Sequence, residues 1–288
     1  MNRRYFIAGC GAAALAGSVQ AQAANPLDRI AVLSWSFRDA FGKTRAKNGG
    51  WVPDKDLDIF DYPEMIADRY HVHNVEVQTM YLEQDATFVR EFRNRLQRAK
   101  SKLVSIAAEP GTEVIQGIGS PDEKARENAL AVYRKWIDYT ADIGCPILMI
   151  NQGNLYDDLN PLIDSGKKLS EYGRGKKVAV TVEPRGNSGR QPELLERVIQ
   201  ASGMGATPDM GNFADDARER GLRLLVPLAV GTLHTRYAPA RFDFTKIMGI
   251  TRELGYKGLY TIEANFNGNP YDQVQMVLDQ IVKYLSAA

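Results

Sequence analysis

The stretch KKVAVTVEPRGN, residues 176–187, decides the fold. At its centre, residues 178–183 form a short apolar run rich in β-branched side chains, and this run ends on the carboxylate of Glu183. A run of this length and composition predicts a strand buried on both faces, as in a parallel sheet. Seven similar runs predict further strands at residues 30–35, 72–78, 103–108, 147–151, 205–209, 229–234 and 258–263.

Amphipathic helical patterns separate these runs. They cover residues 86–99, 121–143, 191–201 and 244–254, and a last helix at 271–285 follows the eighth strand. Eight strand–helix units in about 260 residues are typical of an α/β fold of the (β/α)8 TIM barrel type. We therefore predict a single barrel domain over residues 24–288. A doubly wound sheet is the alternative, but no Gly-x-Gly-x-x-Gly turn follows the first strand.

The N-terminal segment 1–23 has the pattern of a cleavable export signal. Arg3-Arg4 precedes Tyr5-Phe6-Ile7 and a stretch of small apolar residues, and Ala21-Gln22-Ala23 is an A-x-A cleavage motif. The string resembles a twin-arginine signal, with Asn2 where Ser or Thr is usual. We expect the twin-arginine export machinery as a partner and a periplasmic or otherwise exported location.

Composition excludes several classes of function. The 288 residues carry 36 basic and 35 acidic side chains, a net charge of +1, so nucleic acid is not an expected partner. No apolar run reaches the roughly 20 residues that span a bilayer. Cleavage after Ala23 would remove Cys10 and leave Cys145 as the only cysteine of the mature chain. An intrachain disulfide is then excluded, and we expect Cys145 to be a buried packing residue.

Four predicted strands end on residues of the types that commonly serve as metal ligands. They are Glu183, Asp209, His234 and Glu263, and each follows the one before it by a single strand–helix unit. Because successive strand ends lie on one ring of a barrel, these four side chains are expected to converge. Three carboxylates and one imidazole suit a single divalent ion, Mn²⁺ in the first place, with Co²⁺, Mg²⁺ or Zn²⁺ as alternatives.

Other polar residues at strand ends are candidates for substrate or ligand-supporting contacts. These are Glu76, Glu109, Asn151, Arg185, Asn212 and Arg236. A long loop, residues 36–58, follows the first strand and contributes Trp51 as a further candidate. We interpret it as a lid over the catalytic face, with a disordered surface insertion as the alternative. His71 and His73 precede the second strand and are interpreted as structural residues.

These segments together resemble the xylose-isomerase-like barrel superfamily of sugar isomerases and epimerases. The likeness is carried by Val180-Thr181-Val182-Glu183, Pro208-Asp209-Met210-Gly211-Asn212-Phe213, Leu233-His234-Thr235-Arg236 and Ile262-Glu263, with support from Asn74-Val75-Glu76-Val77, residues 136–145 and Gly255-Tyr256-Lys257-Gly258. The resemblance implies that Glu183, Asp209, His234 and Glu263 bind the metal and that both glutamates act as acid/base groups. Asn212 stands where ketose 3-epimerases usually have His, and Arg236 where many members have Lys.

Three functions follow as hypotheses. The first is an isomerase or epimerase that moves a proton next to the carbonyl of a keto sugar through an enediolate, with Glu183 and Glu263 as proton carriers. The second is a lyase that uses the same proton removal to expel a β-leaving group from a keto sugar or 3-keto-glycoside. The third is a non-catalytic periplasmic sugar-binding protein. The sequence leaves the sugar and the oligomeric state open, a homodimer being one option.

Overall fold

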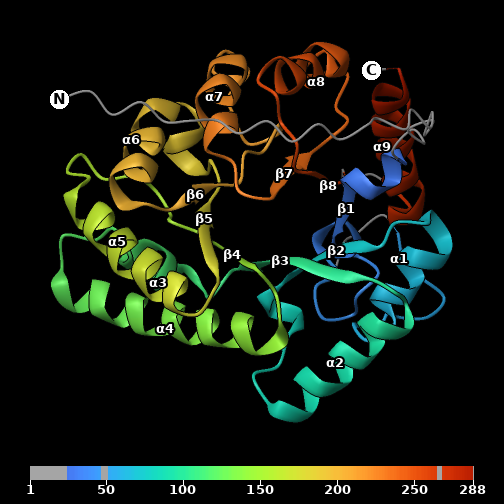
Figure 1. Cartoon of the computed structure of the whole chain (residues 1–288), viewed down its shortest axis with the longest axis horizontal. Coiled ribbons are helices and arrows are strands. Elements are labelled where there is room, and N and C mark those ends of the chain that lie inside the picture. Colours follow the sequence, from blue (N-terminus) through green and yellow to red (C-terminus); the bar gives the residue numbers. More distant parts are fainter. Residues whose placement is uncertain (1–24, 47–50, 265–267, 288) are drawn as a thin grey trace, which may run out of the picture.

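Eight parallel strands form the centre of the molecule (Figure 1). The structure, a computed structural model, describes residues 25–46, 51–264 and 268–287. The strands are β1 (Ile30–Leu33), β2 (Asn74–Gln78), β3 (Lys102–Ala108), β4 (Ile147–Ile150), β5 (Ala179–Val182), β6 (Gly205–Ala206), β7 (Thr232–Thr235) and β8 (Leu259–Ile262). Their hydrogen-bonded order is β6-β5-β4-β3-β2-β1-β8-β7. The predicted barrel of parallel strands is confirmed.

The ring closes between β6 and β7 through single bridges rather than a continuous ladder. Ala206 pairs with Ala229, and Asp209 pairs with His234, both in the parallel sense. The His234 amide donates to the carbonyl of Pro208, and the Met210 amide donates to the carbonyl of His234. This contact brings two of the predicted metal ligands side by side.

Helices surround the strands on the outside (Figure 1). They are α1 (Tyr62–Tyr70), α2 (Ala86–Arg98), α3 (Thr112–Gly117), α4 (Glu123–Ile143), α5 (Asn160–Gly175), α6 (Pro192–Ser202), α7 (Arg218–Leu225), α8 (Phe244–Glu253) and α9 (Pro270–Ser286). Side chains of Asp85, Asp122, Asp243 and Asn269 cap the first amides of α2, α4, α8 and α9. Such caps satisfy amides that have no partner within the helix, so these four helices start where the sequence supplies a capping side chain.

The first predicted strand is shorter than expected. It ends at Leu33, and residues Ser34–Phe37 form a 3-10 turn. The loop that follows contains no long helix or strand up to α1, and its residues 47–50 lie outside the described part of the chain. The consequence is that Trp35, expected inside a strand, lies in the turn above the barrel.

Other predictions for single residues have clear outcomes. Cys145 is buried, and burial raises the pKa of its thiol. The thiol therefore stays protonated and unreactive, in agreement with a packing role. His71 ends α1 in the left-handed conformation, and a ring nitrogen of His73 lies 3.1 Å from the carbonyl of Ala99, so both are structural. No helix of the described ranges is long and apolar enough to cross a membrane. The predicted export signal lies outside the described residues.

Candidate metal centre

One nitrogen of His234 is the point at which the predicted ligands meet. Its Nδ1 atom lies 3.2 Å from Glu183 Oε2, 3.3 Å from Glu263 Oε2 and 3.7 Å from Asp209 Oδ2. Glu183 and Glu263 directly follow β5 and β8, His234 lies within β7, and Asp209 follows β6. The barrel therefore brings together side chains from four different strand–helix units that are distant in the sequence.

The other nitrogen of His234 is held by Glu76. His234 Nε2 lies 3.0 Å from Glu76 Oε1, and both side chains are buried in the interior of the barrel. A carboxylate accepts hydrogen bonds, so Nε2 donates and Nδ1 is turned to the other three carboxylates. Nδ1 is buried and makes no hydrogen bond with any residue that the structure describes. A buried nitrogen without a partner, facing three carboxylates, fits a metal ligand.

Asp209, like His234, has one side-chain atom held by the protein and another turned to the site. Its Oδ1 atom accepts the backbone amides of Gly211 and Asn212, at 2.5 and 3.1 Å. Its Oδ2 atom is the one nearest to His234. Ligand atoms of Glu183, Asp209 and His234 all lie within 4.8 Å of one another, so these three residues have the spacing to hold one ion. Glu263 approaches the same nitrogen from the fourth strand end.

Two arginines pair with these carboxylates. Arg236 Nη2 lies 2.5 Å from Glu263 Oε1 and 3.2 Å from Asp209 Oδ2. Arg185 pairs through Nε with Glu183, and its Nη2 atom lies 2.8 Å from Glu109 Oε1. Each arginine thus joins two acidic side chains of the site and limits the repulsion between them.

The protonation of the site reflects this crowding. Burial opposes the negative charge of Glu183, but Arg185 and His234 together outweigh it and hold the pKa of Glu183 below its usual range. Burial prevails at Glu263 and raises its pKa. Burial also opposes a charge on His234, yet Glu76 and the three ligand carboxylates raise the His234 pKa well above its ordinary value. The negative charge of the carboxylates favours a proton on His234. A divalent cation would supply the same positive charge in place of that proton.

A cavity of about 430 Å³ opens above the cluster. Its lining comes from the carboxyl ends of the strands and the loops that follow them: Trp35, Gln78, Met80, Glu109, Arg185, Gly186, Asn212, Arg236 and Glu263. Substrates of barrel enzymes bind at this end of the strands. The cavity therefore places a bound molecule next to Glu263 and both arginines.

Most of the predicted contact residues gather at this cavity. Glu109, Arg185, Asn212 and Arg236 line it, and the Asn212 side chain lies 3.4 Å from Glu183 Oε2. Asn151 lies behind the lining, where its amide donates to Glu109 Oε2 at 3.0 Å.

Two predicted residues occupy other positions. Glu76 lies beneath His234 and supports a ligand rather than contacting the cavity. Trp51 does not line the cavity, because its ring packs edge-on against Tyr271 with ring centroids 5.9 Å apart. Contact of Trp51 with a substrate stays a prediction, as does the lid interpretation of its loop.

Sequence reasoning missed Trp35, Gln78 and Met80. A signal for Gln78 was present, because it lies two residues after Glu76, and alternate residues of a strand face the same side. Trp35 carried no comparable signal, since a strand was expected to continue through it. Met80 follows β2 in the turn Thr79–Tyr81.

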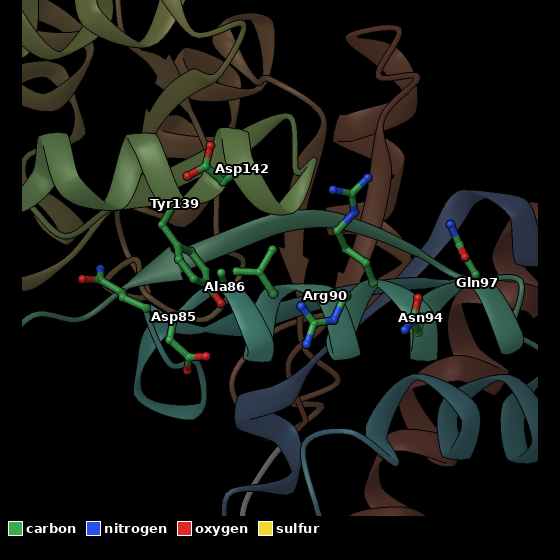
Figure 2. A pocket seen from close by; sticks show the side chains of 10 residues that line it. Asp85, Ala86, Arg90, Asn94, Gln97, Tyr139 and Asp142 are labelled. Carbon is green, nitrogen blue, oxygen red and sulfur yellow. The ribbon is translucent and has the colours of Figure 1, made fainter.

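A second hollow of similar size, about 460 Å³, lies outside the barrel between α2 and α4. Figure 2 shows Asp85, Arg90 and Gln97 on one side of it and Tyr139 and Asp142 on the other. None of the residues that meet at His234 lines this hollow. Size alone therefore does not distinguish the two, and the chemistry of the lining favours the cavity over the strand ends.

The geometry agrees with the comparison of the chain with known families. The model of one family, described as xylose isomerase-like TIM barrel, matches residues 60–281. The chain belongs to the xylose isomerase-like TIM barrel family. The resemblance found in the sequence is thus confirmed. A sequence comparison with curated proteins finds no significant match.

Several solved structures share the fold of this xylose isomerase-like barrel. A xylose isomerase-like TIM barrel protein from Mycobacterium smegmatis in complex with magnesium has a TM-score of 0.63 and 15% identity, over 90% of this chain and 97% of that one. D-psicose 3-epimerase from Clostridium cellulolyticum with D-tagatose gives 0.64 and 13%, over 90% and 97%. The 3-keto-D-glucoside 4-epimerase of E. coli gives 0.64 and 14%, over 90% and 99%. At these identities the likeness shows the fold alone.

Proposed function

We propose that this chain is a metal-dependent isomerase or epimerase of a keto sugar. One observation carries the proposal: Glu183 and Glu263 lie 3.2 and 3.3 Å from the same nitrogen of His234. They follow strands separated in the ring by β6 and β7, so they approach that nitrogen from different sides. Two carboxylates on different sides of one substrate can remove a proton on one face and return a proton on another.

Glu183, Asp209, His234 and Glu263 would hold one divalent ion, with Mn²⁺ as our first choice and Co²⁺, Mg²⁺ or Zn²⁺ as alternatives. When bound, the ion supplies Lewis-acid polarisation of the substrate carbonyl and so stabilises negative charge beside it. The relatives by fold include a magnesium complex and two sugar epimerases, which supports both the ion and the substrate class.

The glutamates of the site would transfer protons, and the arginines would orient the substrate. One glutamate, Glu183 or Glu263, takes a proton from the carbon next to the carbonyl. The other returns a proton to the opposite face of that carbon, which gives an epimer. Alternatively it protonates the former carbonyl carbon while the proton of the neighbouring hydroxyl passes to the former carbonyl oxygen, which gives an isomer. Arg185 and Arg236 line the cavity beside these groups and would orient substrate oxygens through their several N–H donors.

Glu109 favours elimination as a second candidate reaction. It lines the cavity together with Glu263, and burial raises its pKa against the opposing charge of Arg185. A protonated carboxyl group can donate its proton to a leaving oxygen. Loss of the proton beside the carbonyl, formation of a C=C bond and departure of the protonated β-oxygen would together give an unsaturated keto sugar.

The test is proton exchange in D₂O. The protein is loaded with Mn²⁺ and incubated with D-fructose, D-psicose, D-tagatose and a methyl 3-keto-glucoside, and deuterium at carbon is followed by NMR. We expect one C–H of a substrate to exchange, with an epimer or isomer as product. An unsaturated product indicates elimination. Turnover without deuterium indicates a hydride shift, with the glutamates acting only as ligands. Binding without exchange or turnover indicates a non-catalytic sugar-binding protein.

A further inference from the structure

The two sides of the cavity above the strand ends differ in charge. The side formed after β5 to β8 carries Arg185, Asn212, Arg236 and Glu263, next to the proposed ligands. The side formed after β1 and β2 carries Trp35, Gln78 and Met80, none of which is charged. The reacting part of a substrate belongs at the charged side, so the uncharged side is left for the part that does not react.

Gln78 is the polar group of this uncharged side. The residue is 4% exposed, and its Oε1 atom is buried and accepts no hydrogen bond from the part of the chain that the structure describes. An amide oxygen without a partner in a buried position is costly for the folded state, because it has lost its water. Such an atom is kept where a ligand supplies the missing donor.

The neighbours of Gln78 limit the kind of ligand that fits. Trp35 and Met80 offer apolar surface, and Glu109, held by Asn151 and Arg185, lies at the border to the charged side. A donor hydroxyl next to an apolar C–H surface is the chemistry of a sugar carbon skeleton. None of the described residues that line this side carries a charge to pair with a second charged group on the substrate.

We propose that Gln78 accepts a hydrogen bond from a hydroxyl group on the part of the sugar that does not react, while Trp35 and Met80 cover the adjacent C–H surface. This subsite rests on the proposed function and deepens it. It makes Gln78 a specificity-determining residue and predicts a substrate whose hydroxyl-bearing chain or ring extends away from the metal ligands. A polyhydroxy sugar fits this arrangement, because it carries a hydroxyl group for Gln78 that a short keto acid lacks.

The test combines two variants with a series of deoxy sugars. The Mn²⁺-loaded protein is titrated calorimetrically with the keto sugars of the exchange experiment, and the tightest ligand becomes the parent. Analogues of the parent that lack one hydroxyl at a time, outside the reacting keto-alcohol, form the series. Gln78→Leu and Gln78→Met remove the acceptor at similar volume. Gln97→Leu, in the hollow between α2 and α4, is the matched control (Figure 2).

We expect both Gln78 variants to bind the parent about tenfold more weakly than wild type, while Gln97→Leu binds as wild type does. One deoxy analogue should bind wild type equally weakly and lose nothing further in the variants. The thermal midpoint of the Gln78 variants should stay equal or rise, because an unpaired buried acceptor has been removed.

Two results overturn the subsite while leaving the proposed function intact. One is unchanged affinity for the parent in both variants. The other is an equal loss for the parent and every deoxy analogue together with a lower midpoint, which marks a structural role. If no keto sugar binds or exchanges deuterium, the proposed function itself fails, and the subsite fails with it.

Discussion

His234 and Glu76 form a buried pair in the interior of the barrel, with Nε2 of the imidazole 3.0 Å from Oε1 of the carboxylate. The pair joins β7 to β2, two strands that are not neighbours in the ring. It fixes the imidazole so that Nδ1 faces Glu183, Asp209 and Glu263. Glu76 therefore acts on the proposed ion through His234 and is a positioning residue.

The first prediction concerns this pair. Glu76→Gln should weaken Mn²⁺ affinity about 10- to 100-fold, because an amide neither enforces the Nε2–H tautomer nor strengthens the imidazole as a ligand. Affinity is measured by competition with a chelating dye. Glu113→Gln, on the outer helix α3, is the control and should bind Mn²⁺ as wild type does. Equal affinity in Glu76→Gln and wild type would show that the pair has no role in metal binding.

The second prediction concerns the ion itself. Wild type loaded with Mn²⁺, Co²⁺ or Zn²⁺ should carry about one ion per chain, and His234→Ala should lose it while keeping its far-ultraviolet circular dichroism. At an ion concentration of 100 times Kd, binding should stabilise wild type by about 2.7 kcal/mol, and a chelator should reverse this gain. Elemental analysis and thermal unfolding measure both effects. Absence of divalent metal in wild type under every loading condition would refute the site.

The third prediction concerns the chemistry. Glu183→Gln and Glu263→Gln keep the size of the side chain and one oxygen ligand but remove the base. Each should lower kcat by roughly two to four orders of magnitude, with a smaller effect on metal content. The readout is turnover and deuterium incorporation for the sugar on which wild type acts. Near wild-type activity in both variants would exclude proton transfer by these residues and make Glu109 the next candidate.

The fourth prediction concerns export. Residues 1–23 are proposed to be a twin-arginine signal, and replacing Arg3 and Arg4 with Lys should leave the protein in the cytoplasm. Cell fractionation with antibody detection measures the distribution of wild type and variant. The doubly substituted chain should keep its metal content, since the barrel begins after the signal. Unchanged export of the variant contradicts the twin-arginine interpretation.

The sequence by itself determined the class of fold and the convergence of four residues. The apolar runs that end near Glu183, Asp209, His234 and Glu263 recur at intervals of one strand–helix unit. In a parallel barrel this local periodicity fixes which ends of the strands share a rim, so the meeting of these side chains followed without coordinates.

Only the tertiary structure decided which partners each of these groups has. The 3.0 Å contact of Glu76 with His234 joins residues 158 positions apart, and Arg185 and Arg236 each join two carboxylates of different strands. Trp51 was expected in the cavity and packs on Tyr271, while Trp35 and Gln78 line the cavity instead. Strand alternation from Glu76 pointed to Gln78, but the other outcomes depend on side-chain directions and on where a strand gives way to a turn, which the packing of distant segments sets.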